Sequence, residues 1–381
     1  MSVTVTRTPG DYSFAGNQIR FDFESDTPDE FTISIKAGNE DTEYISLFPH
    51  GAAAPYKTYI DISGLLKGSF KDPVYPEGVM IGLIQDFAIT YQLGINDQVL
   101  FTGTAFRGGL SEYALAMLYD NQYDIFHYRL QSLFNQFLFT IRTHTDIISL
   151  RETELYPFVF IHPGISIQFR SGSGNTIDAG TLPSGSICTM DIQAVLDQFL
   201  IRYNEVPTVV DVCPGSERSF SFRIQKSLPA EEKYTIRFLN SLGAYEVIEV
   251  TGQAKHAPQM ADESLYNKLS DYGFYEERRK RVLSREILQV ETGYRSHDQL
   301  QFIQDMIKSD EIYFIFPDRS YFRSNVTAEN IQFNHRIITP TSIQLNVRMV
   351  TDEQFHSPKL DQAMLEYDGG IFDEHEDESF E

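Results

Sequence analysis

Residues 18–24 have the sequence Gln-Ile-Arg-Phe-Asp-Phe-Glu, in which apolar and polar side chains alternate without a break. Successive side chains of an extended strand point to opposite faces, so this pattern places three large apolar groups on one face and three charges on the other. Residues 31–36, Phe-Thr-Ile-Ser-Ile-Lys, repeat the pattern after the turn-forming sequence Asp-Thr-Pro-Asp-Glu at 26–30. We therefore predict two strands whose apolar faces, with Phe21 and Ile33, point into a core.

The two-residue period returns along much of the chain and sets the fold class. Later alternating segments are expected to turn Phe222 and Ile236 inward in the same way. Aromatic residues make up 13% of the chain, as 29 Phe and 21 Tyr with no Trp, and both types favour strands. We predict a mainly β chain of multi-domain β-sandwich architecture, with a few short helices and an acidic, disordered C-terminal tail.

Breaks in this pattern divide the chain into regions. The predicted regions are an N-terminal β-sandwich (1–104), an irregular α+β insertion or interface region (105–205), a small β domain (206–257), a β-sandwich with one packed helix (258–352) and an acidic tail (353–381). Helical spacing of apolar residues predicts helices at 110–119, 191–200 and about 297–308. Ser111 is the expected N-cap of the first helix.

The formal charge of the chain excludes some partners. Lys and Arg number 31 and Asp and Glu 54, which gives −23. The segment 360–381 holds nine of the acids and no Lys or Arg, so the body alone carries −14. An acidic surface repels the phosphates of nucleic acids and anionic lipid headgroups, so we expect binding to neither nucleic acid nor membrane. An acidic surface also suits a channel through which DNA passes without binding to the wall.

Cysteine usage and apolar patterning indicate the compartment. Cys188 and Cys213 are the two cysteines, and spacing alone does not establish whether they pair. Two thiols in 381 residues fit a reducing compartment. The N-terminal residues lack the apolar core of a secretory signal, and the apolar runs are too short to span a bilayer. We therefore expect synthesis in the cytoplasm.

Catalytic motifs are missing, and we predict a protein that is not an enzyme and needs no cofactor or metal. Phosphate loops, dinucleotide-binding glycine patterns, nucleophile elbows and zinc-spaced cysteines do not occur. Glu152 and Glu154 form a carboxylate pair that a glycosidase would use, but a structural role is favoured because Trp platforms for a sugar are absent. His144 and Asp146 more simply form a surface hydrogen-bonded pair than a metal site.

Two further stretches suggest contacts. Residues 276–281, Glu-Glu-Arg-Arg-Lys-Arg, are the one dense basic run, and either alternating strand faces or a contact with an acidic neighbouring subunit accounts for them. Residues 105–135 hold many rings without alternation, which indicates an interface or arm, or else a loop-rich subdomain that packs on its own chain. The rings expected at this interface are Phe106, Tyr113, Tyr119, Tyr123, Phe126 and Tyr128.

Three strings resemble a known family. They are 103–112 (Gly-Thr-Ala-Phe-Arg-Gly-Gly-Leu-Ser-Glu), 138–156 with the strand 157–161 that follows, and 236–244 (Ile-Arg-Phe-Leu-Asn-Ser-Leu-Gly-Ala). Each is similar to sequences in tail-associated structural proteins of phages and prophages from Bacteroides-type gut bacteria. Leu239 departs from the family, which usually has a bulkier residue before this Asn.

The resemblance implies a subunit that is made in the host cytoplasm and assembles in symmetric copies on a virion tail, baseplate or adaptor. Its partners would be further copies of itself and neighbouring virion proteins. The alternative is a β-sandwich adhesin that binds carbohydrate. Without Trp, such an adhesin would need tyrosines such as Tyr119, Tyr123 and Tyr128 as its platforms for sugar rings.

Overall fold

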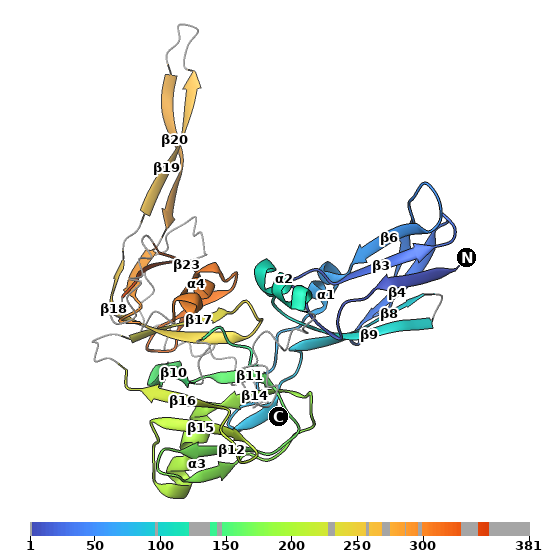
Figure 1. Ribbon diagram of the computed structural model, residues 1–381. Coiled ribbons are helices and arrows are strands. Elements are labelled where there is room, and N and C mark those ends of the chain that lie inside the picture. The colour runs from blue at the N-terminus through green and yellow to red at the C-terminus, as the bar shows by residue number, and fades with distance from the viewer. Residues whose placement is uncertain are drawn as a thin grey trace, which may run out of the picture.

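The computed structural model confirms a mainly β chain with multiple sheets and a few helices (Figure 1). Two of the predicted features, the acidic tail at 353–381 and the start of the helix at 297–298, lie outside the described residues. The structure describes residues 2–95, 98–121, 138–142, 147–227, 233–256, 259–268, 275–285, 287–295, 299–328 and 342–349.

The N-terminal part is a sandwich of two sheets, as its alternation predicts. One sheet has the order β1 (Val3–Arg7), β3 (Arg20–Ser25), β6 (Tyr56–Asp61). The other has the order β2 (Tyr12–Phe14), β9 (Gln98–Phe106), β8 (Ala88–Ile95), β4 (Phe31–Ala37), β5 (Glu43–Leu47). Phe21 and Ile33 are fully buried between the sheets, which confirms their predicted direction. The short helix α1 (Ser63–Ser69) contributes Leu66 to the same core.

The middle part contains two sheets and one helix. Its larger sheet has the order β10 (Ile147–Arg151), β16 (Phe220–Gln225), β15 (Val209–Pro214), β12 (Ile167–Ser171), β13 (Thr176–Asp178). Its smaller sheet has the order β11 (Pro157–Ile161), β14 (Ile187–Asp191), β7 (Ile81–Leu83). Phe222 is fully buried in the core that these sheets share with α3 (Ile192–Tyr203), and Asp191 caps that helix through the backbone N–H of Ala194 at 3.2 Å.

The third part is a six-stranded closed barrel. Its order is β17 (Lys233–Leu239), β18 (Tyr245–His256), β21 (Ile287–Glu291), β24 (Gln344–Met349), β23 (Tyr321–Thr327), β22 (Ile312–Ile315), and β22 pairs back with β17. The helix α4 (Leu300–Lys308) turns Phe302, Ile303 and Met306 into the barrel core, as its spacing predicts. Ile236 is fully buried there, which confirms the fourth core prediction.

Strand pairing cuts across two of the expected boundaries. The segment 206–257 does not make one sheet, because β15 and β16 join the middle part while β17 and β18 belong to the barrel. Within the span 1–104, β7 leaves the sandwich and pairs with β14. In both places the sheet that a strand joins is set by partners far apart in the sequence. Local alternation carries no information about those partners.

A two-stranded ribbon extends from the barrel, away from the other sheets (Figure 1). It consists of β19 (Gln259–Lys268) and β20 (Tyr275–Arg285), inserted between the barrel strands β18 and β21. Over the described residues, β19 and β20 hydrogen bond as a sheet only with each other. Each strand of the ribbon therefore keeps one edge of backbone N–H and C=O groups without a strand partner.

A contact between glycines joins the N-terminal sandwich to the barrel. The backbone N–H of Gly16 donates to the carbonyl of Gly108 at 2.5 Å, and that of Gly109 donates to the carbonyl of Ser241 at 2.6 Å. Gly108 has a φ of +88°, and a Cβ atom built on it would lie 2.5 Å from the backbone nitrogen of Gly243. The two loops pass so closely that no side chain fits between them.

We predict that Gly108→Ala destabilises the chain by about 2–4 kcal/mol, because it adds a steric clash to an unfavourable φ. Gly174→Ala is the matched control, since Gly174 has a φ of +93° but open space around it, and it should cost only about 1–2 kcal/mol. Urea unfolding of both variants measures the difference. Equal losses would mean that the close contact at Gly108 contributes nothing.

Candidate functional site

Six charged side chains are buried together where the middle part meets the barrel. Glu154 lies on the 3₁₀ turn η2 (Glu152–Glu154) directly after β10, and Glu246 and Glu249 lie on β18. The arginines come from three places in the chain, and the three positive and three negative charges balance. All six are at most 5% exposed, namely Arg142, Arg151, Glu154, Glu246, Glu249 and Arg295.

Glu154 stands at the centre of this network and is 0% exposed. One carboxylate oxygen accepts from Arg295 Nη2 at 2.6 Å and from the backbone N–H of Glu249 at 2.8 Å. The other accepts from Arg142 Nη1 at 3.1 Å and from the backbone N–H of Arg151 at 3.2 Å. Four donors thus replace the water that this carboxylate loses on burial.

The remaining acids of the network bind around this centre. Glu249 accepts from Arg151 Nη1 at 3.1 Å, and Glu246 accepts from the Tyr156 hydroxyl at 2.9 Å and from Asn240 Nδ2 at 2.6 Å. Asn240 belongs to the turn that carries the glycine contact. The charge network and the glycine contact are therefore linked through one residue.

Arg142 connects the network to the barrel helix. Its guanidinium group lies 4.0 Å from the centre of the Phe302 ring on α4, and it also donates to the carbonyl of Val247 on β18. A guanidinium over an aromatic face is favourable when it is shielded from water, so this contact adds to the ion pair with Glu154.

The surroundings of Glu154 fix its ionisation. Burial raises the pKa of its carboxyl, but Arg142, Arg295 and the hydrogen bonds lower it more strongly, and the result is a pKa of about 2. A carboxyl with this pKa carries no proton to donate near neutral pH. Glu152 is exposed, so the two acids do not face one cleft. The two acids lie on the 3₁₀ turn Glu152–Glu154, and the arrangement of a glycosidase pair is not formed.

Of the six rings expected at an interface, the structure describes the surroundings of two, and these surroundings differ. Phe106 is 0% exposed and packs against Phe14 and Phe139, so its assignment to an interface is corrected to core. Tyr113 is 76% exposed on α2 (Glu112–Asn121). The backbone of Tyr119 continues this helix. The other three, Tyr123, Phe126 and Tyr128, lie outside the described residues.

The start of α2 confirms the predicted helix and its cap. The backbone N–H of Ala114 donates to the hydroxyl of Ser111 at 3.2 Å, which satisfies one of the free donors of the first turn. This cap fixes α2 next to the Gly108–Gly109 loop that touches the barrel.

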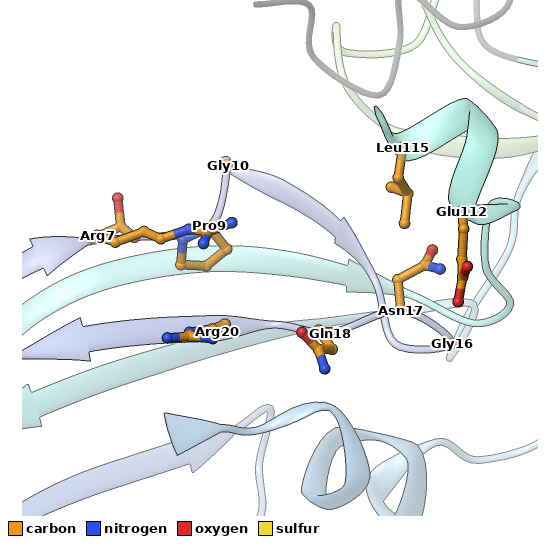
Figure 2. Close-up of a pocket in the computed structure, with 10 residues that line it drawn as sticks. Arg7, Pro9, Gly10, Gly16, Asn17, Gln18, Arg20, Glu112 and Leu115 are labelled. Atoms are coloured by element: carbon orange, nitrogen blue, oxygen red, sulfur yellow. The ribbon is translucent and has the colours of Figure 1, made fainter. Parts of the chain in front are cut away.

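A polar pocket of about 440 Å³ lies between β3, the loop after β1 and the start of α2 (Figure 2). Among its lining residues are Arg7, Asn17, Gln18, Arg20 and Glu112. No aromatic ring is among the ten residues that line it. Sequence reasoning gave no signal for this pocket, because its residues come from separate strands, loops and a helix and match no motif.

The basic run at 276–281 lies on β20, which spans Tyr275–Arg285. Its cross-strand partners on β19 include Glu263, opposite Arg281, and Leu265, opposite Arg278, with a bulge between Glu263 and Ser264. The prediction of a strand is therefore confirmed for this run. An inter-subunit contact stays a prediction.

Other predicted positions can be placed briefly. Cys188 and Cys213 are both free and buried, so they form no disulfide. His144 and Asp146 lie outside the described residues, and within the described ranges no His, Cys, Asp and Glu side chains gather as a metal-binding group. None of the helices in the described part has the length and apolar character that a membrane span requires.

Comparison with known proteins finds no matching family model and no matching curated protein.

We predict that Glu154→Gln lowers the free energy of unfolding by about 3–5 kcal/mol, because it leaves buried arginine charge without its partner. The matched control is Glu152→Gln on the same turn, where the side chain is exposed and the expected change is about 0.5 kcal/mol or less. Urea unfolding at pH 7 measures both. A loss below about 1 kcal/mol for Glu154→Gln would contradict a central role for this carboxylate.

The same carboxylate should make stability depend on acid pH. Its pKa of about 2 in the folded chain lies below the ordinary value of 4.5, so its contribution is complete above pH 4.5 and is lost as the pH falls toward 2. The stability difference between the natural chain and Glu154→Gln should therefore shrink by about 3 kcal/mol across this range. A difference that stays constant in urea unfolding between pH 5 and pH 2.5 would refute the assignment.

Proposed function

We propose that the chain is a non-enzymatic structural subunit of a phage tail, baseplate or related virion assembly, and that it works through oligomeric protein contacts. The observation that carries the oligomeric part of the proposal is the projecting ribbon of β19 and β20. The virion part is supported by the sequence resemblance.

A bare two-stranded ribbon is marginally stable in water. β20 has 11 residues, a length of about 36 Å at 3.3 Å per residue. Both outer edges present backbone donors and acceptors that invite another chain to pair. A neighbouring subunit that covers the ribbon would pair with these backbone groups.

Charge indicates which surface would cover it. The ribbon carries the dense basic run Arg278–Arg281, whereas the whole chain has a net charge of −23. The acidic body of a second copy is the complementary surface, and opposite charge favours docking in one register. Repetition of this contact around an axis would generate a closed ring.

The three strings that resemble phage tail proteins meet where the parts of the chain are joined. Gly108 from the first string touches the turn 240–243 from the third, and Arg142 and Glu154 from the second belong to the buried network. An assembly subunit depends on the residues that fix how its domains are joined. This placement supports a structural reading of the resemblance.

The carbohydrate-binding alternative is supported by one feature, the polar pocket in Figure 2. Its amide and charged groups suit hydroxyls, but a sugar ring usually also stacks on an aromatic face, and the lining provides none. The geometry therefore favours assembly over sugar binding.

We predict that the purified chain forms closed rings or tubes, and that replacing residues 259–285 by a short Gly-Ser linker leaves it monomeric. Sedimentation velocity and electron microscopy at equal protein concentration measure this. A matched control shortens the exposed loop at 172–174, which is remote from the ribbon, and should assemble normally.

Two results would contradict the proposal. One is assembly of the ribbon-deleted chain at the same concentration as the natural chain. The other is a natural chain that stays monomeric and shifts on a glycan array, which would support the adhesin instead.

A further inference from the structure

A cleft of about 580 Å³ lies between the N-terminal sandwich and the barrel, beside the glycine contact. On the sandwich side its lining includes Lys67 and Phe70, at the C-terminal end of α1, and Arg107, which follows β9. On the barrel side it includes Ser241 and Lys308, the last residue of α4. Both parts of the chain therefore supply walls, and sites for small molecules commonly form at such domain junctions.

Arg107 carries a charge that the protein compensates only in part. Its side chain is 17% exposed, and its guanidinium lies 5.7 Å from the centre of the Phe70 ring. Among the described residues, one hydrogen-bond acceptor meets it, the carbonyl of Lys71, although a guanidinium has five N–H donors. The acid nearest to it, Asp72, is 3.7 Å away and 95% exposed, so water screens that attraction. Arg107 is thus held in one orientation with donors that have no acceptor.

The lysines of the cleft also lack a close anionic partner. Within the part of the chain that the structure describes, neither Lys67 nor Lys308 forms a salt bridge. The buried network differs in this respect, because its three arginines are matched by three carboxylates. Positive side chains from both walls of the cleft are therefore available to an anion.

Two acids also line the cleft, and their positions limit the repulsion that they add. Asp305 is 9% exposed and is directed to the barrel turn, where its oxygens accept from the backbone N–H of Ser241 at 2.9 Å and from the Ser241 hydroxyl. Asp310 is exposed, so water screens it. Three positive side chains thus face two negative ones, in a chain whose net charge is −23.

The pocket in Figure 2 is a weaker candidate for an anion. Its Arg20 already pairs with Asp22 at 2.6 Å and lies 4.1 Å from the centre of the Tyr59 ring. Glu112 adds a negative charge to that lining.

We propose that the cleft between the sandwich and the barrel binds a small phosphate-bearing molecule, which Lys67 and Arg107 hold from one wall and Lys308 holds from the other. The planar guanidinium matches two oxygens of a phosphate group, and the lysine ammonium groups act as point charges. The bound anion compensates the charge of Arg107 and links the two walls. Because both walls belong to one chain, the site does not depend on the proposed assembly.

The test uses inorganic pyrophosphate as the probe and the full-length chain as the protein. Isothermal titration calorimetry in about 0.1 M NaCl, where the Debye length is about 10 Å, should give a Kd below about 1 mM. Sulfate should bind at least about tenfold more weakly at the same ionic strength, because it offers one tetrahedral group to the three cations.

Variants on each wall locate the site. Lys67→Gln and Lys308→Gln should each weaken pyrophosphate binding about fivefold or more, because each removes one charge-assisted contact. The matched control combines Lys36→Gln with Lys226→Gln, two exposed lysines that do not line the cleft, and should leave the Kd within about twofold. Circular dichroism checks that each variant folds.

Urea unfolding of the natural chain adds a measurement that needs no variant. A ligand that binds the folded chain and not the unfolded chain raises the unfolding midpoint. Pyrophosphate should therefore raise this midpoint more than sulfate does at equal ionic strength.

Four outcomes would overturn the inference. Absence of both a heat of binding and a shift in the unfolding midpoint would show that the cleft holds no such anion. Equal effects of pyrophosphate and sulfate would indicate general screening of charge. Equal weakening in the control and in the cleft variants would place the anion elsewhere. Citrate that binds as tightly as pyrophosphate would refute the choice of phosphate over carboxylate.

Discussion

The arrangement of this chain depends on the cost of burying the carboxylate of Glu154. An ionised group away from water is tolerated only when donors surround it, and here they come from 142, 151, 249 and 295. These positions belong to the middle part and to the barrel. Because removing any partner leaves a charge exposed to an apolar interior, the network selects one relative placement of the two parts. Other placements of the two parts are excluded mainly because they would leave buried charges unpaired. The strength of the ion pairs themselves contributes less.

The glycine contact adds a second constraint of a different kind. The network is electrostatic, whereas the approach of Gly108 to Gly243 is steric and excludes any side chain. Asn240 takes part in both, since its amide binds Glu246 and its turn carries Gly243. The N-terminal sandwich, the middle part and the barrel are in this way held around one small region. The ribbon then extends from a barrel whose position is defined.

The local sequence pattern predicted those features of the fold that depend on residues close together in the chain. Alternation correctly turned Phe21, Ile33, Phe222 and Ile236 inward, and Ser111 and Asp191 lie at the starts of the helices expected there. Pairing between distant strands was not predictable, so the closure of the barrel by β17 and β22 and the transfer of β7 to β14 were missed. Phe106 was misassigned because missing alternation was taken as missing burial, although Phe14 and Phe139 enclose it. Glu154 was recognised as structural, but its arginine partners lie up to 141 residues away.

The place of the ribbon in the barrel has a mechanical consequence. β18 and β21, which continue into the two ribbon strands, are themselves paired neighbours, with Thr251 opposite Glu291 and His256 opposite Leu288. A force that pulls along the ribbon is therefore passed to two strands that lie inside a closed sheet. Ladder hydrogen bonds on both sides of these strands then share the load at the same time, whereas a force across an open edge would break them one after another. The barrel is in this respect an anchor suited to tension along the ribbon.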